Sequence, residues 1–397
     1  MRSGPQFPAI AAFLVLAGAA VSGQQPSFRV DTELVVVAVQ VVNGRGEPVL
    51  DLTRENFDVR IGGRTRRVVS AQLMTASEGP SGLAPPAAIP SSGRSAESST
   101  PVRNAPPRTF VVAVDITSFD HGTSRGMVLA AQDFVRRLAR TDYVGLAAYP
   151  DGQALDPTTN HEAALQALQR VVGVREPPSL PLTPKDVLTG GGAYALSRCG
   201  WSDIGCQRMI ELQVLDVVGY YESLAKRSLH ALRDVLAGLS RIDGRKTLVL
   251  VSGGMVAADS SAGRPNVGDL GTVLGQEAAR ANVTIYTLFV DWRYLESASA
   301  SKAGTPSGFS SEDSRVLSRW LEKFTDAAGG KLFTVFTGSG EYAFDSVLRE
   351  TSSYYLLGVE PHESDRDGRP RELRVRTNVK ARDVLVRARS WVTVPAR

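Results

Sequence analysis

Residues 109–115 read TFVVAVD and residues 247–251 read TLVLV, and both runs consist almost entirely of β-branched and other apolar residues. A strand that is apolar on both faces is typical of a parallel sheet covered by helices on both sides, because neither face meets water. Residues 143–149 (YVGLAAY) and 284–290 (TIYTLFV) have the same character. These four runs predict the buried strands of an α/β domain.

The segments between these runs have the periodicity of amphipathic helices. Residues 124–139 place six apolar side chains on one helical stripe: Met127, Ala130, Ala131, Phe134, Val135 and Leu138. Further helices are predicted at residues 162–171, 207–239, 270–281 and 315–328, followed by a strand at 331–336. Strand and helix therefore alternate over residues 108–351, which predicts a doubly wound, mostly parallel sheet.

One insertion, at about residues 174–206, interrupts this alternation with four prolines, three consecutive glycines and the two cysteines. Cys199 and Cys206 are separated by six residues, a spacing that suits a small-loop disulfide in an oxidising compartment. Two free thiols are the alternative. Zinc is disfavoured because no histidine lies near the pair.

The two ends of the chain have β character. Strands are predicted at residues 33–42, 57–61, 65–73, 354–359, 372–377 and 384–394. Each terminal segment supplies three of these strands, and three strands alone would leave exposed edges. Residues 28–74 and 354–394 are therefore expected to pack together as a β-sandwich-like domain. Residues 75–107 are rich in Ser, Pro, Ala and Gly and are predicted to be a disordered linker.

The first 23 residues have the layout of a secretory signal peptide. Arg2 precedes the apolar run at residues 8–21, and small residues follow before Gln24. A retained membrane anchor is the alternative, and the sequence leaves cleavage open. No other segment has about 18 uncharged apolar residues, so we expect no transmembrane segment in the mature chain and a secreted or periplasmic location.

The charge balance disfavours nucleic acid as a partner. The chain has 45 Lys and Arg residues against 41 Asp and Glu residues, and the small excess is dispersed along the sequence. Nucleic-acid binding proteins concentrate basic residues into a patch or stripe. A protein partner, whose identity the sequence does not reveal, is therefore expected instead.

Several motifs in order resemble one family. Residues 51–57 (DLTRENF), 110–119 (FVVAVDITSF), 246–254 (KTLVLVSGG), 354–358 (YYLLG) and 368–375 (GRPRELRV) carry the likeness. Together they resemble the bacterial VWFA-related proteins, which contain a von Willebrand factor type A-like (VWA-like) domain. The resemblance covers nearly all of residues 28–394 and implies a VWA-like core in an exported binding or adhesion module.

The resemblance also implies a metal-ion-dependent adhesion site, whose first loop has the form Asp-x-Ser-x-Ser. Asp115 and Thr117 match the Asp and the first Ser of this loop. Phe119 stands where the second Ser would be, and it has no side-chain oxygen. The family's later Asp turn is here Ser252-Gly253-Gly254, without a carboxylate. The site is therefore degenerate, and Mg²⁺ or another divalent cation is expected to bind weakly or not at all. The alternative is that Asp115 and Thr117 only cap the following helix.

Enzymatic signatures fail in their context. Residues 338–343 fit G-x-G-x-x-[GA], but the chain that follows is too short for a nucleotide-binding half and reads as antiparallel strands. Ser252 has Leu250 two residues before it, so it does not lie in a G-x-S-x-G elbow. We therefore expect a non-enzymatic protein.

The expected binding surface is the edge of the sheet beyond the carboxyl ends of its strands, where open α/β sheets bind ligands. Its residues are Ser118, Phe119, Ser252, Gly253 and Gly254. Two alternatives remain: a structural cell-envelope protein that acts through its β-sandwich, and a nucleotide-cofactor enzyme.

Overall fold

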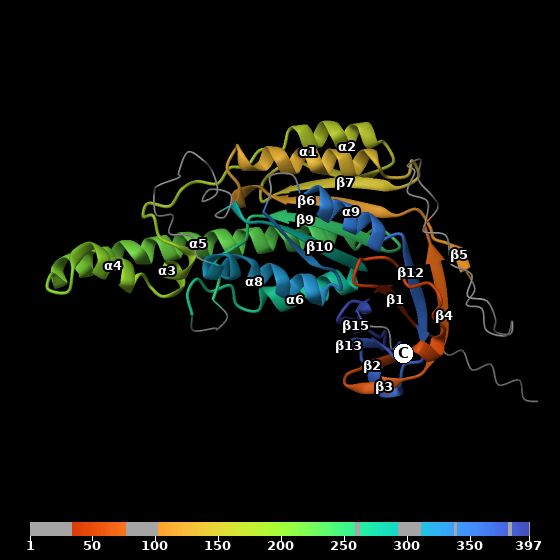
Figure 1. Ribbon diagram of the computed structural model, residues 1–397. Coiled ribbons are helices and arrows are strands. Elements are labelled where there is room, and N and C mark those ends of the chain that lie inside the picture. Colours follow the sequence, from red (N-terminus) through yellow and green to blue (C-terminus); the bar gives the residue numbers. More distant parts are fainter. Residues whose placement is uncertain are drawn as a thin grey trace, which may run out of the picture. The chain divides into compact units, whose positions relative to one another are not determined.

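The computed structural model (Figure 1) describes residues 34–76, 102–258, 263–292, 311–336, 340–379 and 383–396. The predicted signal peptide, residues 77–101 of the predicted linker and residues 338–339 of the glycine motif lie outside these ranges. The predicted α/β class is confirmed, because a sheet with parallel strands lies between two layers of helices.

The main sheet has six strands in the order β11-β10-β9-β6-β7-β8. Their bounds are β6 (Thr109–Asp115), β7 (Tyr143–Tyr149), β8 (Ala154–Thr158), β9 (Lys246–Ser252), β10 (Val283–Val290) and β11 (Leu332–Val335). All neighbours are parallel except β7 and β8. Strand β8 was not predicted from the sequence; its residues ALDPT include a proline, which a strand tolerates at the edge of a sheet.

Helices cover both faces of this sheet. One layer contains α1 (Thr123–Arg136), α2 (His161–Gln169) and α9 (Glu341–Glu350). The other contains α5 (Ile204–Leu239), α6 (Leu270–Arg280) and α8 (Ser311–Ala327). Alternate residues of β6 enter opposite cores, so Val112 packs under α1 while Val111 belongs to the α5 side.

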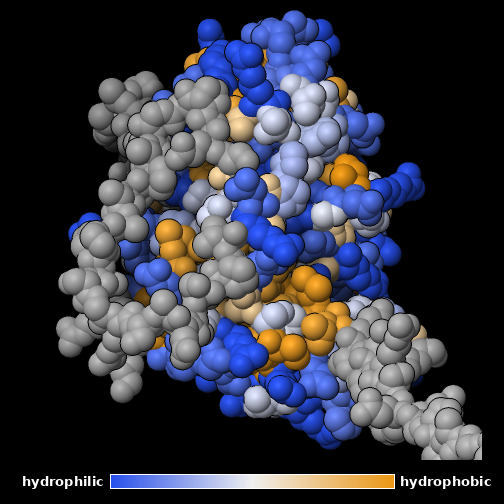
Figure 2. All heavy atoms as spheres, turned by 90° about the vertical axis from the view of Figure 1, so that its right-hand side faces the viewer, coloured by the Kyte–Doolittle hydropathy of each residue, from blue (hydrophilic) through white to orange (hydrophobic). Residues whose placement is uncertain are grey.

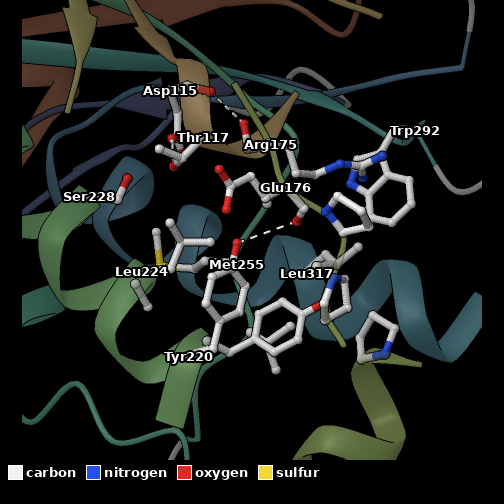
Figure 3. A pocket seen from close by; sticks show the side chains of 18 of the residues that line it. Asp115, Thr117, Arg175, Glu176, Tyr220, Leu224, Ser228, Met255, Trp292 and Leu317 are labelled. Carbon is white, nitrogen blue, oxygen red and sulfur yellow. Dashed lines mark hydrogen bonds between the residues drawn. The ribbon is translucent and has the colours of Figure 1, made fainter. Parts of the chain in front are cut away.

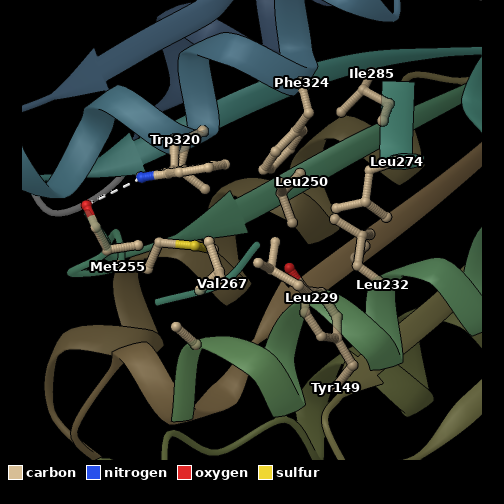
Figure 4. Packing of buried hydrophobic residues seen from close by; sticks show 14 of the residues in the cluster. Tyr149, Leu229, Leu232, Leu250, Met255, Val267, Leu274, Ile285, Trp320 and Phe324 are labelled. Atoms are coloured by element: carbon tan, nitrogen blue, oxygen red, sulfur yellow. Dashed lines mark hydrogen bonds between the residues drawn. The ribbon is translucent and has the colours of Figure 1, made fainter. Parts of the chain in front are cut away.

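The core on the α5 side is dense and mostly aliphatic. Figure 4 shows Leu229 and Leu232 of α5 beside Leu250 of β9, with Phe324 of α8 above them. The indole nitrogen of Trp320 donates to the carbonyl of Ala257, which satisfies the one polar atom of this large side chain.

The two ends of the chain form two further sheets. One has the order β14-β1-β12-β4-β5 and the other β15-β13-β2-β3. The N-terminal strands are β1 (Val35–Val42), β2 (Phe57–Ile61), β3 (Arg64–Arg66), β4 (Val68–Thr75) and β5 (Val102–Asn104). The C-terminal strands are β12 (Ser353–Val359), β13 (Pro370–Thr377), β14 (Leu385–Arg387) and β15 (Trp391–Thr393). Strands from both ends pair with each other, and both sheets contribute to one apolar cluster.

Figure 2 shows the side of the molecule to which these terminal strands belong, where hydrophilic residues surround smaller apolar patches. Three predictions for this region were wrong in detail. The predicted strand at 65–73 is divided into β3 and β4, which pair with β2 and β12 respectively. The predicted linker begins too early and ends too late, because β4 continues to Thr75 and residues 102–104 form β5.

The predicted strand at 384–394 is also divided, into β14 and β15. Ser390 lies between them and donates its backbone N–H to Ala327 at the end of α8. The chain there leaves one sheet, bonds to the α/β core and enters the other sheet. Hydrogen bonds to a distant helix decided this break, which no local pattern indicates.

The insertion is helical over about half of its length. It contains α3 (Pro184–Leu188), α4 (Gly192–Cys199) and the first turn of α5. Cys199 and Cys206 form a disulfide between α4 and α5, with Cα atoms 5.6 Å apart. No helix in the described part of the chain is both long enough and apolar enough to cross a bilayer.

A buried polar network joins the α/β core to the terminal strands. The Glu350 carboxylate at the end of α9 lies 3.0 Å from the Arg387 guanidinium of β14 and accepts from the Tyr286 hydroxyl of β10 at 3.2 Å. Tyr286 also donates to the side chain of Gln40 on β1. Glu350 is 1% exposed, so removal of its charge would leave Arg387 without its partner in a nearly dry environment.

We predict that Glu350→Ala lowers the free energy of unfolding by about 3–5 kcal/mol, the usual cost of leaving one member of a buried ion pair alone. Urea unfolding would measure the change. The control is Glu372→Ala, which removes an exposed pair with Arg374 and should cost less than about 1 kcal/mol. Equal losses in the two variants would show that the network does not stabilise the junction.

Candidate functional site

Three neighbouring strands end at the same edge of the main sheet. Val114 of β6 is in register with Val251 of β9, and Ser252 of β9 with Phe289 of β10. The residues that follow these positions therefore meet although they are far apart in sequence. β6 and β9 are also the point at which the strand order reverses, where open α/β sheets form their ligand crevice.

A cavity of about 420 Å³ opens above this edge. Its floor includes Asp115, Thr117 and Ser118, which follow β6 or end it. The remaining walls come from the loop after β6, the insertion, α5, the loops after β9 and β10, and α8: Asp120, Arg175, Glu176, Pro177, Pro178, Pro181, Leu182, Pro184, Tyr220, Tyr221, Leu224, Ala225, Ser228, Gly254, Met255, Val256, Trp292 and Leu317. Figure 3 shows Glu176 pointing toward Thr117 and Ser228 inside this space.

Asp115 is a buried carboxyl at the bottom of the cavity. One of its oxygens accepts from the Thr117 hydroxyl at 2.8 Å, and the other from the Ser252 hydroxyl at 3.2 Å. Burial raises the pKa of Asp115 to about 6, although hydrogen bonds from Thr117, Ser228 and Ser252 act in the opposite direction. The protein therefore holds a carboxyl group that is half-ionised at about pH 6.

The turn after β9 is built to approach the turn after β6. The Ser118 hydroxyl donates to the Asp115 carbonyl at 2.7 Å and accepts from the Gly253 N–H at 2.7 Å. A side chain at Gly253 would place its Cβ 2.6 Å from the Ser118 carbonyl oxygen, and Gly254 has a φ of +91°. Both glycines are therefore needed for this approach and for the shape of the turn.

The rim of the cavity carries charge and aromatic rings. The Arg175 guanidinium lies 3.6 Å from the centre of the Trp292 ring and 3.4 Å from the Asp120 carboxylate. The Tyr220 hydroxyl of α5 donates to the Glu176 carbonyl at 3.3 Å. These contacts tie the insertion to the loop after β10 and to α5, and thus hold the walls in place.

The predicted site residues are brought to one edge but have different roles. Asp115, Thr117, Ser118 and Gly254 line the cavity. The expected surface position of Phe119 was wrong, because its ring is 1% exposed and packs in the core under α1. The side chain of Ser252 and the Gly253 residue are also buried and support the floor rather than line it.

Helix capping does not explain Asp115 and Thr117. The next helix, α1, begins at Thr123 after Gly122, and no side chain caps it. Asp115 precedes only a short 3₁₀ turn at Ile116–Ser118, and its side chain makes no capping hydrogen bond there. The carboxyl group instead faces the hydroxyls around the cavity floor.

A divalent cation does not fit this set of residues well. Both oxygens of Asp115 already accept hydrogen bonds, and the Ser118 hydroxyl is engaged by two backbone groups. In the described part of the chain, no group of three or more His, Cys, Asp or Glu residues is placed to hold a metal. Mg²⁺ demands near-octahedral oxygen ligands, so these residues do not complete such a site.

Most residues of the cavity walls were not predicted from the sequence. Arg175, Tyr220 and Trp292 lie in an insertion, a long helix and a loop whose meeting depends on the tertiary path of the chain. The only local signal was the run of prolines in the insertion. No protein-family model matches this chain, and no curated protein matches it.

The raised pKa of Asp115 predicts a specific pH dependence of stability. The folded pKa, about 6, lies above the ordinary value of 3.8, so the folded state binds the proton more tightly. This group therefore makes the free energy of unfolding fall as pH rises from about 4 to about 6, with no further change above. Asp115→Asn cannot ionise and should lack this component.

We predict that Asp115→Asn is about 3 kcal/mol more stable than the parent protein at about pH 7.5 and equally stable at about pH 4. Urea unfolding at the two pH values measures both differences. Thr117→Val is a useful comparison, because it removes a hydrogen bond to the carboxyl group without removing its charge. A constant difference between Asp115→Asn and the parent at both pH values would contradict the assignment.

Proposed function

We propose that this chain is an exported, non-enzymatic binding module with a VWA-like core, and that the cavity above Asp115 holds part of a protein partner. The observation that carries the proposal is the position of the cavity at the strand reversal, between β6 and β9. The motifs at residues 110–119 and 246–254 support the VWA-like assignment, because they end at this same edge. The paired terminal strands support the proposal of a sandwich-like second domain.

The lining favours binding over catalysis. The described residues around the cavity include no histidine, cysteine or lysine, and hence no imidazole base and no thiol or amine nucleophile. Asp115 is the only buried carboxyl on the described floor, and its neighbours are hydroxyls rather than a charged partner. Prolines, tyrosines and leucines form rigid apolar walls, which suit retention of a ligand.

The same chemistry indicates what part of a partner fits. An apolar or aromatic side chain would contact Tyr221, Leu224 and Met255 along the walls. A hydrogen-bond donor at the end of that side chain would reach the carboxyl group of Asp115. Such a donor would stabilise the ionised form of a carboxyl group whose ionisation burial disfavours, and so would bind more tightly when Asp115 is ionised.

Peptides selected from a random phage-displayed library on the purified protein provide a defined probe. We predict that Leu224→Asp weakens binding of the selected peptides at least about tenfold, because it places a charge in an apolar wall. Asp115→Asn should weaken peptides that carry a terminal donor. Arg376→Ala on β13 is the control and should change nothing. Equal binding by all variants would show that the cavity is not the binding site.

We propose that this binding is independent of divalent metal. Isothermal titration of the purified protein with Mg²⁺, Mn²⁺ or Ca²⁺ should give no saturable heat up to about 1 mM, the weak end of the range for protein oxygen sites. EDTA should leave the affinity for the selected peptides unchanged. A saturable metal signal that Asp115→Asn abolishes would overturn this part of the proposal.

A further inference from the structure

Helix α5 has two apolar faces, and only one of them is used by the fold. Its buried residues begin at Val214 and continue to Leu239, whereas no residue from Ile204 to Gln213 is buried. Figure 1 shows this first part of α5 extending with α4 beyond the strands of the main sheet. The disulfide between Cys199 and Cys206 holds the two helices together at this end.

The second apolar face lies opposite the buried one. Its apolar members are highly exposed: Ile204 at 73%, Met209 at 66%, Leu212 at 59% and Leu215 at 64%. At about 100° per residue these four side chains fall within an arc of about 140° on the helix, together with Arg208 and Asp216. Val214, which packs against Gly191, points to the other side. We call the exposed set the outer face of α5: Ile204, Arg208, Met209, Leu212, Leu215 and Asp216.

The outer face is self-complementary about Leu212. Arg208 and Asp216 are each four residues from Leu212, in opposite directions, and Met209 and Leu215 are each three residues from it. Gly205 and Gly219 are each seven residues away. If two such helices pack antiparallel with their Leu212 residues together, Arg208 of one copy meets Asp216 of the other, twice, as two-fold symmetry requires.

Contacts within the described part of the chain do not account for Arg208, Asp216 or Gly219. Among the described residues, neither Arg208 nor Asp216 has an ion-pair partner, and both are exposed. A Cβ at Gly219 would meet nothing within 4 Å, so nothing in this chain requires a glycine there. Glycine in a helix interior costs about 1 kcal/mol relative to alanine, and close approach of a second helix is a physical reason to tolerate it.

We propose that the outer face of α5 binds the same face of a second copy of this chain, antiparallel about a two-fold axis at Leu212. A membrane surface suits the face less well. Its Asp216 and the adjacent exposed Glu211 offset Arg208, so the segment offers no excess of positive charge to anionic lipid. The symmetric spacing of opposite charges favours a second copy.

Sedimentation velocity of the purified protein over a concentration series tests this dimer. The parent chain should show reversible dimerisation. Arg208→Asp or Asp216→Arg should weaken it at least about tenfold, because each substitution places like charges together twice. The double variant Arg208→Asp with Asp216→Arg should restore most of the affinity. Arg233→Asp, exposed on the same helix outside the outer face, should have no effect.

A cross-linking experiment locates the axis. Leu212→Cys should give a covalent dimer with a short bis-maleimide, whereas Arg233→Cys should not, and the native cysteines are disulfide-bonded. A monomer at all concentrations, or a dimer that ignores the charge reversals, would overturn the proposal. So would monomeric protein that co-sediments with phosphatidylcholine–phosphatidylglycerol vesicles and loses this on Leu212→Glu. Peptide binding at the cavity is measured separately and is unaffected by these outcomes.

Discussion

The parallel pairing of β6 with β9 is the constraint on which the rest of this structure depends. It aligns six consecutive residue pairs, from Thr109 with Lys246 to Val114 with Val251. It thereby brings Asp115 and Ser252 into hydrogen-bond contact although 137 positions separate them. Closing so long a loop costs entropy, which burial of both strands on both faces must offset. The cavity, its floor and its walls all follow from this pairing.

The strands that are buried in the core could be predicted from the sequence, whereas the strands at the exposed edges could not. β6, β9 and β10 are apolar on both faces, so their runs are unmistakable. β8 is short, polar and carries a proline, and only its pairing with β7 makes it a strand. The break at residues 388–390 depends on a hydrogen bond to Ala327, which no local pattern contains. Local patterns of apolar residues therefore predict which strands are buried, but they do not predict breaks that depend on long-range hydrogen bonds.

The residues of the candidate site likewise fall into those that the sequence predicts and those that it does not. Asp115 and Thr117 are found because a strand that ends in a carboxylate points to one known edge of the sheet. Phe119 was assigned to the surface by its place in a motif, although its ring fills the core under α1. Arg175, Tyr220 and Trp292 meet only because the insertion folds back over the strand ends. Their convergence is a tertiary property, and a single sequence cannot show it.

Two features of this chain lower the stability of the isolated protein, and contact with another molecule would offset the cost of both. Asp115 is a carboxyl whose ionisation is opposed by burial, and a core selected for stability alone would contain a neutral group there. The outer face of α5 exposes large apolar side chains beside opposite charges that have no partner in the described chain. Exposed apolar surface and desolvated charge are both relieved by contact with another molecule. We propose that the cavity makes one such contact with a side chain of a protein partner, and that the outer face of α5 makes another with a second copy of the chain.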